Sequence, residues 1–389
     1  MLKIFKLYIA SFFIISFFLV ISLELMFQVL VSLKPDYMYL HFMNHKFLEL
    51  NKTQQDEYFK NFNKVTGWPS TNDDRYDQSG KRKNLGLKET NTKDYCISIF
   101  GDSFTFSSEV DFKDSWGAVL GNKLNCSIEN YGVEGFGVDQ SVLRFLEKKG
   151  GESQVVLLGI FTDDIARNLN TMRSLLNLDQ QIDIRKQKPR FVETDNGLTL
   201  QEIYFKNSAQ YMKSKDEETK ILKNEYFLEG DYAKVRFNKL RSISLLKLVY
   251  KKISNLIKYN IDYQILFGVL PETIPLYVSQ KESLSLNDKI IQLFLNECKS
   301  LNKECFIVII PDPLELFYSD RNFTELIYSK RNWEDKVIDL TPTLSERFND
   351  KDICYFIGKN RDCSGHYNVE GYSEIGNAIY KELTRRLVF

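Results

Sequence analysis

A serine and a histidine that are far apart in the chain are the residues best suited to chemistry. Ser103 follows the apolar run Tyr95–Phe100, and Gly101 between them allows a sharp exit from a strand. We therefore expect Ser103 at the carboxyl end of that strand and at the head of a helix, where backbone N–H groups and the positive end of the helix dipole collect. A serine at such a position becomes a nucleophile only if a base takes its proton.

The candidate base is His366, because the chain has only three histidines. His41 and His45 lie close to a long apolar segment near the N-terminus, which leaves His366 as the natural partner of Ser103. His366 stands in the run Asp362–His366, ahead of the last predicted helix. In this pairing Ser103 attacks an ester carbonyl, and His366 accepts its proton and later returns it to the leaving alcohol.

Two further blocks follow predicted strands. The block Asn130–Gly137 is rich in glycine, which lets the backbone pass close to a ligand and turn an N–H group toward it. The block Phe161–Asn168 contains two neighbouring aspartates, an arginine and an asparagine. Because loops that emerge at one edge of a sheet can converge, we expect these blocks to form one pocket with Ser103 and His366.

From Tyr95 onward, short apolar runs alternate with stretches of helical character. The predicted strands are Tyr95–Phe100, Ser127–Tyr131, Gln154–Phe161, Cys305–Ile310 and Val337–Leu340. The predicted helices are Ser115–Leu124, Val138–Lys149, Leu286–Leu301 and Gly371–Leu387. This alternation predicts an α/β fold with a parallel sheet covered on both faces, and ligands bind beyond the carboxyl ends of such strands.

A stretch from about residue 170 to 285 interrupts this alternation and is predicted to be an insertion. It contains a predicted hairpin of Arg190–Glu193 and Leu198–Gln201 around Asp195-Asn-Gly, a favourable tight-turn sequence. Ser242–Ile261 has apolar residues at helical spacing with lysines between them. Such an insertion either flanks a site or only adds packing.

The N-terminal region predicts a membrane anchor. Leu7–Leu33 contains one charged residue, Glu24, and about 20 apolar residues suffice to span a bilayer as a helix. Lys3 and Lys6 precede this segment and favour a cytoplasmic N-terminus. We expect a transmembrane signal-anchor at residues 1–33 with the remainder exported, periplasmic or extracellular, and a cleaved signal peptide is the alternative.

The rest of the chain divides into two predicted parts. Residues 34–94 are polar and interrupted by prolines, and we expect a stalk or linker with a helical piece near Thr53–Lys64. Residues 95–389 are expected to form the domain that carries the serine and the histidine.

Composition excludes some classes of partner. Lys and Arg together number 52, as do Asp and Glu, so the formal net charge is zero. Nucleic-acid binders usually show a basic surplus, and we expect no nucleic-acid partner. The sequence shows no metal-ligand cluster and no nucleotide-binding loop, so we expect neither a metal nor a cofactor.

The six cysteines are even in number, as disulfide pairing in an oxidising compartment requires. The pairs Cys354–Cys363 and Cys298–Cys305 are close enough to close short loops, and Cys96 and Cys126 open two strands that could be neighbours. The alternative is six free, mostly buried thiols.

Taken together, the blocks resemble the SGNH/GDSL hydrolase superfamily, from about Cys96 to the C-terminus with the insertion unmatched. The resemblance implies a three-layer α/β/α sandwich around a parallel sheet. It implies that Ser103 is the nucleophile and His366 the base, and that Asp362 orients the histidine. It further implies an oxyanion hole made by Ser103 N–H, Gly135 N–H and the position that Asp163 occupies here.

This chain departs from the family pattern at two positions. The oxyanion residue is usually an asparagine, and an ionised Asp163 would repel an oxyanion unless it is protonated, turned away or replaced by a donor such as Asn168. The acid usually stands three residues before the histidine, where this chain has Cys363, so Asp362 must reach one residue farther. Further candidates for supporting roles are Asp102, Asp164 and Asn168.

The sequence thus predicts an exported, membrane-anchored serine esterase that acts on O-acyl, in particular O-acetyl, groups of an envelope glycan. One alternative is an O-acetyltransferase of a polysaccharide, which would use the same acyl-enzyme. The other is a non-catalytic domain that binds a glycan or a protein partner. For either enzyme, the expected substrate is an ester or an acylated glycan.

Overall fold

The structure is a computed structural model. It describes residues 2–33, 46–84, 95–162, 164–175, 181–195, 197–214, 225, 281–312, 316, 328–348, 353–358 and 365–387. Two predicted site residues, Asp163 and Asp362, and the predicted helix Ser242–Ile261 lie outside the described residues.

The centre of the molecule is a five-stranded sheet in the order β3-β2-β4-β8-β9, and every neighbouring pair of strands is parallel. The strands are β2 (Tyr95–Phe100), β3 (Ser127–Asn130), β4 (Val155–Phe161), β8 (Glu304–Ile310) and β9 (Val337–Asp339). All five correspond to predicted strands, with bounds that differ by at most one residue. The predicted α/β fold with a parallel sheet is confirmed.

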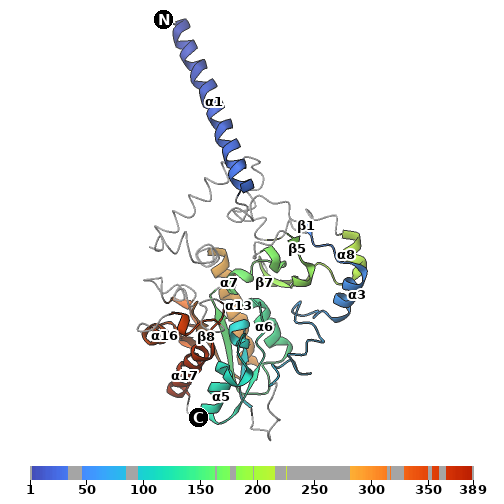
Figure 1. Cartoon of the computed structure of the whole chain (residues 1–389). Coiled ribbons are helices and arrows are strands. Elements are labelled where there is room, and N and C mark those ends of the chain that lie inside the picture. Colours follow the sequence, from blue (N-terminus) through green and yellow to red (C-terminus); the bar gives the residue numbers. More distant parts are fainter. Residues whose placement is uncertain are drawn as a thin grey trace.

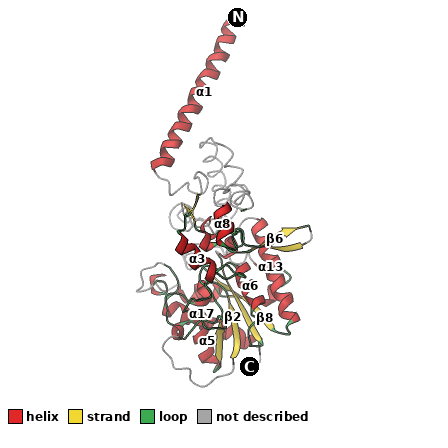
Figure 2. Cartoon of the chain, turned by 90° about the vertical axis from the view of Figure 1, so that its right-hand side faces the viewer, coloured by secondary structure: helices red, strands yellow, loops and turns green. Residues whose placement is uncertain are grey.

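Helices cover both faces of this sheet (Figure 1, Figure 2). They are α5 (Trp116–Leu124), α6 (Val138–Glu147), α13 (Lys281–Ser300), α16 (Thr341–Phe348) and α17 (Val369–Arg386). Strand side chains alternate between two apolar clusters because successive residues of a strand point to opposite faces. In β4, Leu158 packs with α6 and α13, and Leu157 packs with α5, α16 and α17. Strands buried on both faces explain the continuous apolar runs of the sequence.

The predicted hairpin is also confirmed. β6 (Arg190–Thr194) pairs antiparallel with β7 (Gly197–Gln201), and Arg190 lies opposite Gln201. Next along the chain is the short helix α8 (Ser208–Ser214).

Residues 46–84 lie against the sheet domain. This segment contains β1 (Lys46–Phe47), which pairs with β5 (Gln181–Ile182), and α3 (Lys52–Asn61). The amide of Gln140 on α6 donates to the carbonyl of Thr66 at 2.7 Å, and Arg82 N–H donates to Asn130 O at 2.7 Å. The predicted division at residues 1–33, 34–94 and 95–389 stays a prediction, but the described part of the middle segment is in close contact with the sheet.

The N-terminal helix α1 covers Leu2–Leu33 and stands apart from the sheet in Figure 1. Its described apolar side chains, such as Phe12 and Leu19, are exposed. Over the described residues, no helix combines the length and the apolar character that crossing a membrane would take. The predicted transmembrane anchor is not confirmed.

Two disulfides join described residues, Cys96–Cys126 and Cys298–Cys305. The first connects the starts of β2 and β3, which are neighbours in the sheet, and the second connects α13 to β8. Both pairs are among those the spacing suggested. Cys363 lies outside the described residues, so the third pairing stays a prediction. Disulfides are typical of domains in oxidising compartments.

Candidate active site

Ser103 lies where the sequence placed it, at the end of β2 and at the first position of the short helix α4 (Ser103–Phe106). The turn between them requires Gly101, because a Cβ there would lie 2.8 Å from Gly159 O and still closer to the Thr105 side chain. Asp102 is the N-cap, and its Oδ1 accepts the Phe104 N–H at 2.9 Å. This capping holds the turn and fixes the start of the helix.

The serine is nearly buried, with 5% of its surface exposed. Its Oγ donates to Asp102 Oδ2 at 3.3 Å. Among the described residues, no partner accepts the Ser103 backbone N–H. A free N–H at the start of a helix is a suitable donor to an oxyanion.

The glycine-rich block lies directly against the serine block. A Cβ on Gly132 would lie 2.4 Å from the Phe106 backbone nitrogen, so only glycine allows this approach. Gly135 has a φ of +76°, a conformation that glycine adopts without strain. Its N–H, like that of Ser103, donates to no acceptor within the described part of the chain. Among the described residues, the N–H groups of Ser103 and Gly135 are therefore both without an acceptor.

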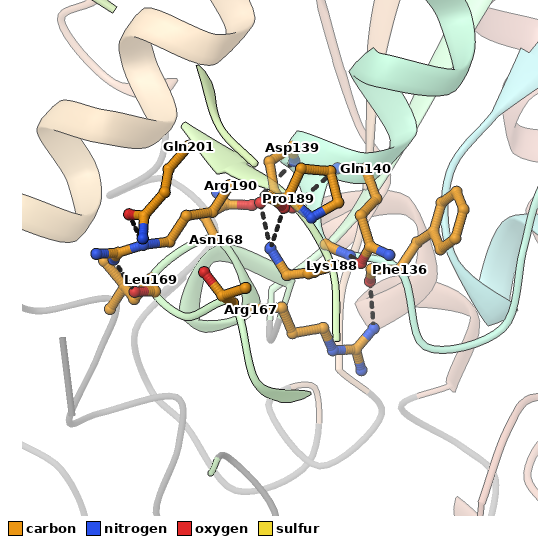
Figure 3. A network of polar contacts seen from close by, with 12 residues as sticks. Phe136, Asp139, Gln140, Arg167, Asn168, Leu169, Lys188, Pro189, Arg190 and Gln201 are labelled. Carbon is orange, nitrogen blue, oxygen red and sulfur yellow. Dashed lines mark hydrogen bonds and ion pairs between the residues drawn. The ribbon is translucent and has the colours of Figure 1, made fainter. Parts of the chain in front are cut away.

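Arg167 joins three of the blocks through one nitrogen. It ends the short helix α7 (Asp164–Arg167), and its Nη1 donates to Phe136 O at 2.8 Å, as Figure 3 shows. The same Nη1 donates to Asp164 Oδ1 at 2.6 Å and to Asp102 Oδ2 at 3.2 Å. Asp102 and Asp164 are fully buried, so this guanidinium compensates carboxylates that would otherwise be costly to bury. This role of Arg167 was not predicted from the sequence, although the spacing of Asp164 and Arg167 on one helical turn favours such a pair.

His366 is placed by a short backbone ladder and by an aromatic contact. Its carbonyl accepts the Gly358 N–H at 2.9 Å, and its ring centroid lies 4.7 Å from that of Phe104. Phe104 is the residue after Ser103, so the imidazole lies over the serine block. No hydrogen bond between described residues joins Ser103 to His366. Instead, His366 Nδ1 lies 3.2 Å from Glu109 Oε1.

Glu109 is a site residue that the sequence analysis missed. It stands in a loop after α4 in which Ser107 and Glu109 have φ values of +63° and +72°. Such left-handed conformations are uncommon for residues other than glycine. No local sequence signal announces a contact between two residues 257 positions apart.

Glu134 is a second carboxylate near His366. Its Oε1 accepts a hydrogen bond from Ser108 Oγ at 2.7 Å, and its Oε2 pairs with Arg75. Burial alone would raise the pKa of Glu134, but Ser108, Arg75 and the nearby His366 hold it below its ordinary value. The glycine block, the serine loop and the histidine loop therefore meet around these carboxylates.

No hydrogen bond between described residues joins Asn168 to Ser103. Its Oδ1 accepts the Asp139 N–H at 3.0 Å, and its Nδ2 donates to Asn287 Oδ1 at 3.2 Å. It thus connects α7 to α6 and α13 in the described structure. Its use as a substitute oxyanion donor stays a prediction.

A buried ion pair lies next to Asn168 (Figure 3). Lys188 Nζ contacts Asp139 Oδ2, and both side chains are 0% exposed. Burial raises the pKa of Asp139 and lowers that of Lys188, and each partner opposes the shift of the other. Arg190 in the hairpin donates to Leu169 O beside this pair. These contacts hold the insertion against the N-terminus of α6.

A pocket of about 300 Å³ is lined by residues of the segment 46–84 and by Arg185. The aromatic residues Tyr58, Phe62 and Trp68 line it together with polar side chains that include Asn61 and Arg185. A Cβ on Gly135 would lie 3.9 Å from the Trp68 ring, whose Nε1 donates to Glu134 O at 2.9 Å. One wall of the pocket therefore contacts the candidate oxyanion turn. The described residues contain no group of side chains suited to a metal ion.

Comparisons with solved structures give distant similarities. No family model matches the chain, and no curated protein matches its sequence. The chain is similar to the structure of a protein assigned to the G-D-S-L lipolytic family from Desulfitobacterium hafniense DCB-2, with a TM-score of 0.34 and 13% identity over 73% of this chain and 97% of that one. A member of the same lipolytic family from Veillonella parvula DSM 2008 gives a TM-score of 0.36 and 13% identity over 75% of this chain and 100% of that one. Similarities at this level carry no information about activity.

Proposed function

We propose that the protein is a serine esterase of the SGNH/GDSL type, with Ser103 as nucleophile and His366 as general base. The observation that carries this proposal is the position of Ser103 at the start of α4. Its N–H group has no acceptor among the described residues, and the His366 imidazole contacts the adjacent Phe104. The proposal requires the Ser103 hydroxyl to turn from Asp102 toward His366 Nε2. Catalytic hydrogen bonds are often loose without substrate.

In the proposed reaction, Ser103 Oγ attacks the ester carbonyl carbon while its proton moves to His366. The N–H groups of Ser103 and Gly135 stabilise the oxyanion of the tetrahedral intermediate. The proton then passes from His366 to the leaving alcohol, and water hydrolyses the acyl-enzyme by the same steps. Asp163, which is outside the described residues, is proposed to lie at the third oxyanion position in protonated or turned form.

Hydrolysis of p-nitrophenyl acetate by the full chain tests the proposal. We expect Ser103→Ala to lower kcat by about 10³-fold or more, because the nucleophile is lost. Ser300→Ala is the matched control, since Ser300 is exposed on α13 and donates only to Glu297 O. A fluorophosphonate should label Ser103, as detected by mass spectrometry. Equal rates for wild type and Ser103→Ala, without labelling, would refute the esterase.

We further propose that the acyl group is carried by a glycan, with the pocket at Trp68 as the binding region. Aromatic faces with amide and charged groups around them suit a sugar, which has both apolar and hydrogen-bonding surfaces. We expect Trp68→Ala to raise KM for acetylated xylan at least about fivefold and to leave p-nitrophenyl acetate kinetics unchanged. Trp68→Phe, which keeps an aromatic ring without the indole N–H, serves as the control. Equal loss with both esters would show that Trp68 only supports the fold.

Two alternatives use the same residues. An O-acetyltransferase would pass the acyl group from Ser103 to a sugar hydroxyl, so acceptor oligosaccharides would increase turnover of the acyl-enzyme. A non-catalytic binding domain is favoured by one observation, the hydrogen bond of Ser103 to Asp102 in place of His366. The Ser103→Ala comparison separates this alternative from both enzymes.

Export and membrane attachment remain predictions from the sequence. They are supported by the uncharged run Leu7–Leu23 and by two disulfides of a kind found in oxidising compartments. Carbonate extraction of membranes from expressing cells tests attachment, with a Phe12→Asp, Leu19→Asp double variant as the comparison. Release of the wild-type chain by carbonate would contradict the anchor.

A further inference from the structure

We propose that Glu109 is the carboxylate that orients His366, in the role that the family resemblance implied for Asp362. This inference rests on the proposed esterase function and names a positioning residue of the same site. Glu109 does not touch the reacting atoms. It acts through the imidazole.

The contact geometry fits this role. His366 Nδ1 lies 3.2 Å from Glu109 Oε1, and a carboxylate can only accept, so Nδ1 is the donor. A proton fixed on Nδ1 leaves the lone pair on Nε2, which is the form of histidine that accepts a proton from a serine. Within the described part of the chain, Nε2 has no hydrogen-bond partner, and the carboxylate of Glu109 has none but His366.

The backbone of Glu109 gives a second argument. Its φ of +72° is a conformation that glycine or asparagine would adopt more easily. A strained residue persists only where its surroundings enforce it, and such residues gather at functional sites. The left-handed turn at Ser107 and Glu109 directs the loop after α4 toward the histidine.

The histidine loop is shaped to receive this carboxylate. Gly365, just before His366, has a φ of +79°, and a Cβ there would lie 2.7 Å from Glu109 Oε1. The glycine therefore leaves the space that the carboxylate occupies. Glu134, the other nearby carboxylate, already binds Ser108 and Arg75, which leaves Glu109 as the described carboxylate directed at Nδ1.

The test compares the two acids in the full chain with p-nitrophenyl acetate. We expect Glu109→Gln to lower kcat about 100-fold or more with KM within threefold, because the imidazole loses its fixed tautomer. Asp362→Asn should stay within threefold of wild type. Asp111→Asn is the matched control, an exposed neighbour without a side-chain cap bond, and Glu109→Asp should retain more activity than Glu109→Gln.

Nitrogen-15 NMR gives a readout independent of turnover. The His366 signals, identified by their loss in His366→Gln, should show the Nδ1–H tautomer in wild type and a shift toward the Nε2–H tautomer in Glu109→Gln. An unchanged tautomer in Glu109→Gln, or a change only in Asp362→Asn, overturns the inference. If instead Ser103→Ala is as active as wild type, the esterase proposal fails, while the tautomer measurement still decides whether Glu109 orients His366.

Discussion

His366 Nδ1 lies 3.2 Å from Oε1 of Glu109, a residue 257 positions earlier in the chain. The contact joins the loop before α17 to the loop after α4, the helix that begins with Ser103. The imidazole also lies against Phe104 on that helix. Residues close to Ser103 in sequence, Phe104 and Glu109, therefore hold the imidazole in place.

Removal of the imidazole should abolish most of the activity. General acid–base groups typically contribute about 10²–10⁴ in rate, so we expect His366→Gln to lower kcat on p-nitrophenyl acetate by that factor. His45→Gln is the control, because it removes a histidine near the apolar N-terminal segment. Similar rates for the two variants would remove His366 from the mechanism.

Gly365→Ala should act through Glu109. The new Cβ would meet Glu109 Oε1. The alanine would also have to adopt the φ of +79° that Gly365 has, which costs a non-glycine residue about 1–2 kcal/mol. We expect kcat to fall about tenfold in the wild-type background. In a Glu109→Ala background the same substitution should have almost no further effect on kcat, as a double-mutant cycle can measure. An undiminished effect there would mean that Gly365 acts on the loop alone.

The buried pair of Lys188 and Asp139 should matter for stability. Lys188→Met leaves a buried carboxylate without its partner, which typically costs about 3–5 kcal/mol of unfolding free energy. Adding Asp139→Asn should recover part of this loss. Urea denaturation followed by circular dichroism measures both.

The control is Lys52→Met in the exposed pair with Asp56, whose side chains are 76% and 58% exposed. Exposed pairs contribute about 0–1 kcal/mol, so this variant should be close to wild type. Equal costs at Lys188 and Lys52 would contradict the assignment of Lys188 and Asp139 as a buried, coupled pair.

Acid should loosen the segment 46–84. Burial opposes ionisation of Asp73, but the hydrogen bonds and charge of Arg75 hold its pKa below the ordinary value, and the pKa of Glu134 is likewise lowered. A carboxyl whose pKa is lower in the folded state stabilises fully above its unfolded pKa of roughly 4 and loses that stabilisation as the pH falls through the folded value. Both groups pair with Arg75, so their protonation should release its contacts.

Trp68 should report the release of the Arg75 contacts, because its indole N–H donates to the backbone carbonyl of Glu134. We expect hydrogen exchange of residues 46–84 to increase and Trp68 fluorescence to change between about pH 4 and pH 2. Arg75→Gln should remove most of this pH dependence. A profile that is the same in both proteins would exclude Arg75 as the link.

Several features could be predicted from the sequence alone, because each depends on residues that are neighbours in the chain. Strands such as Val155–Phe161 are continuous apolar runs because both faces of the sheet are covered, and the hairpin around residue 195 follows from its turn residues. The position of Ser103 could be predicted in the same way, because the neighbouring Gly101 and the capping Asp102 fix the turn before it.

Other features depended on the tertiary structure. The docking of residues 46–84 rests on polar contacts such as those of Arg75 and Trp68, which resemble an ordinary solvated surface in the sequence. The bridging by Arg167 required the ends of three strands to meet at one edge of the sheet.

The partner of His366 illustrates the difference most clearly. The family resemblance implied Asp362, an acid near it in sequence, whereas the described structure places Glu109 at its Nδ1. That contact depends on a left-handed loop and on the space left by Gly365. Backbone turns and apolar periodicity are encoded over a few neighbouring residues, but which side chains meet across distant loops is set only when the packed sheet brings those loops together.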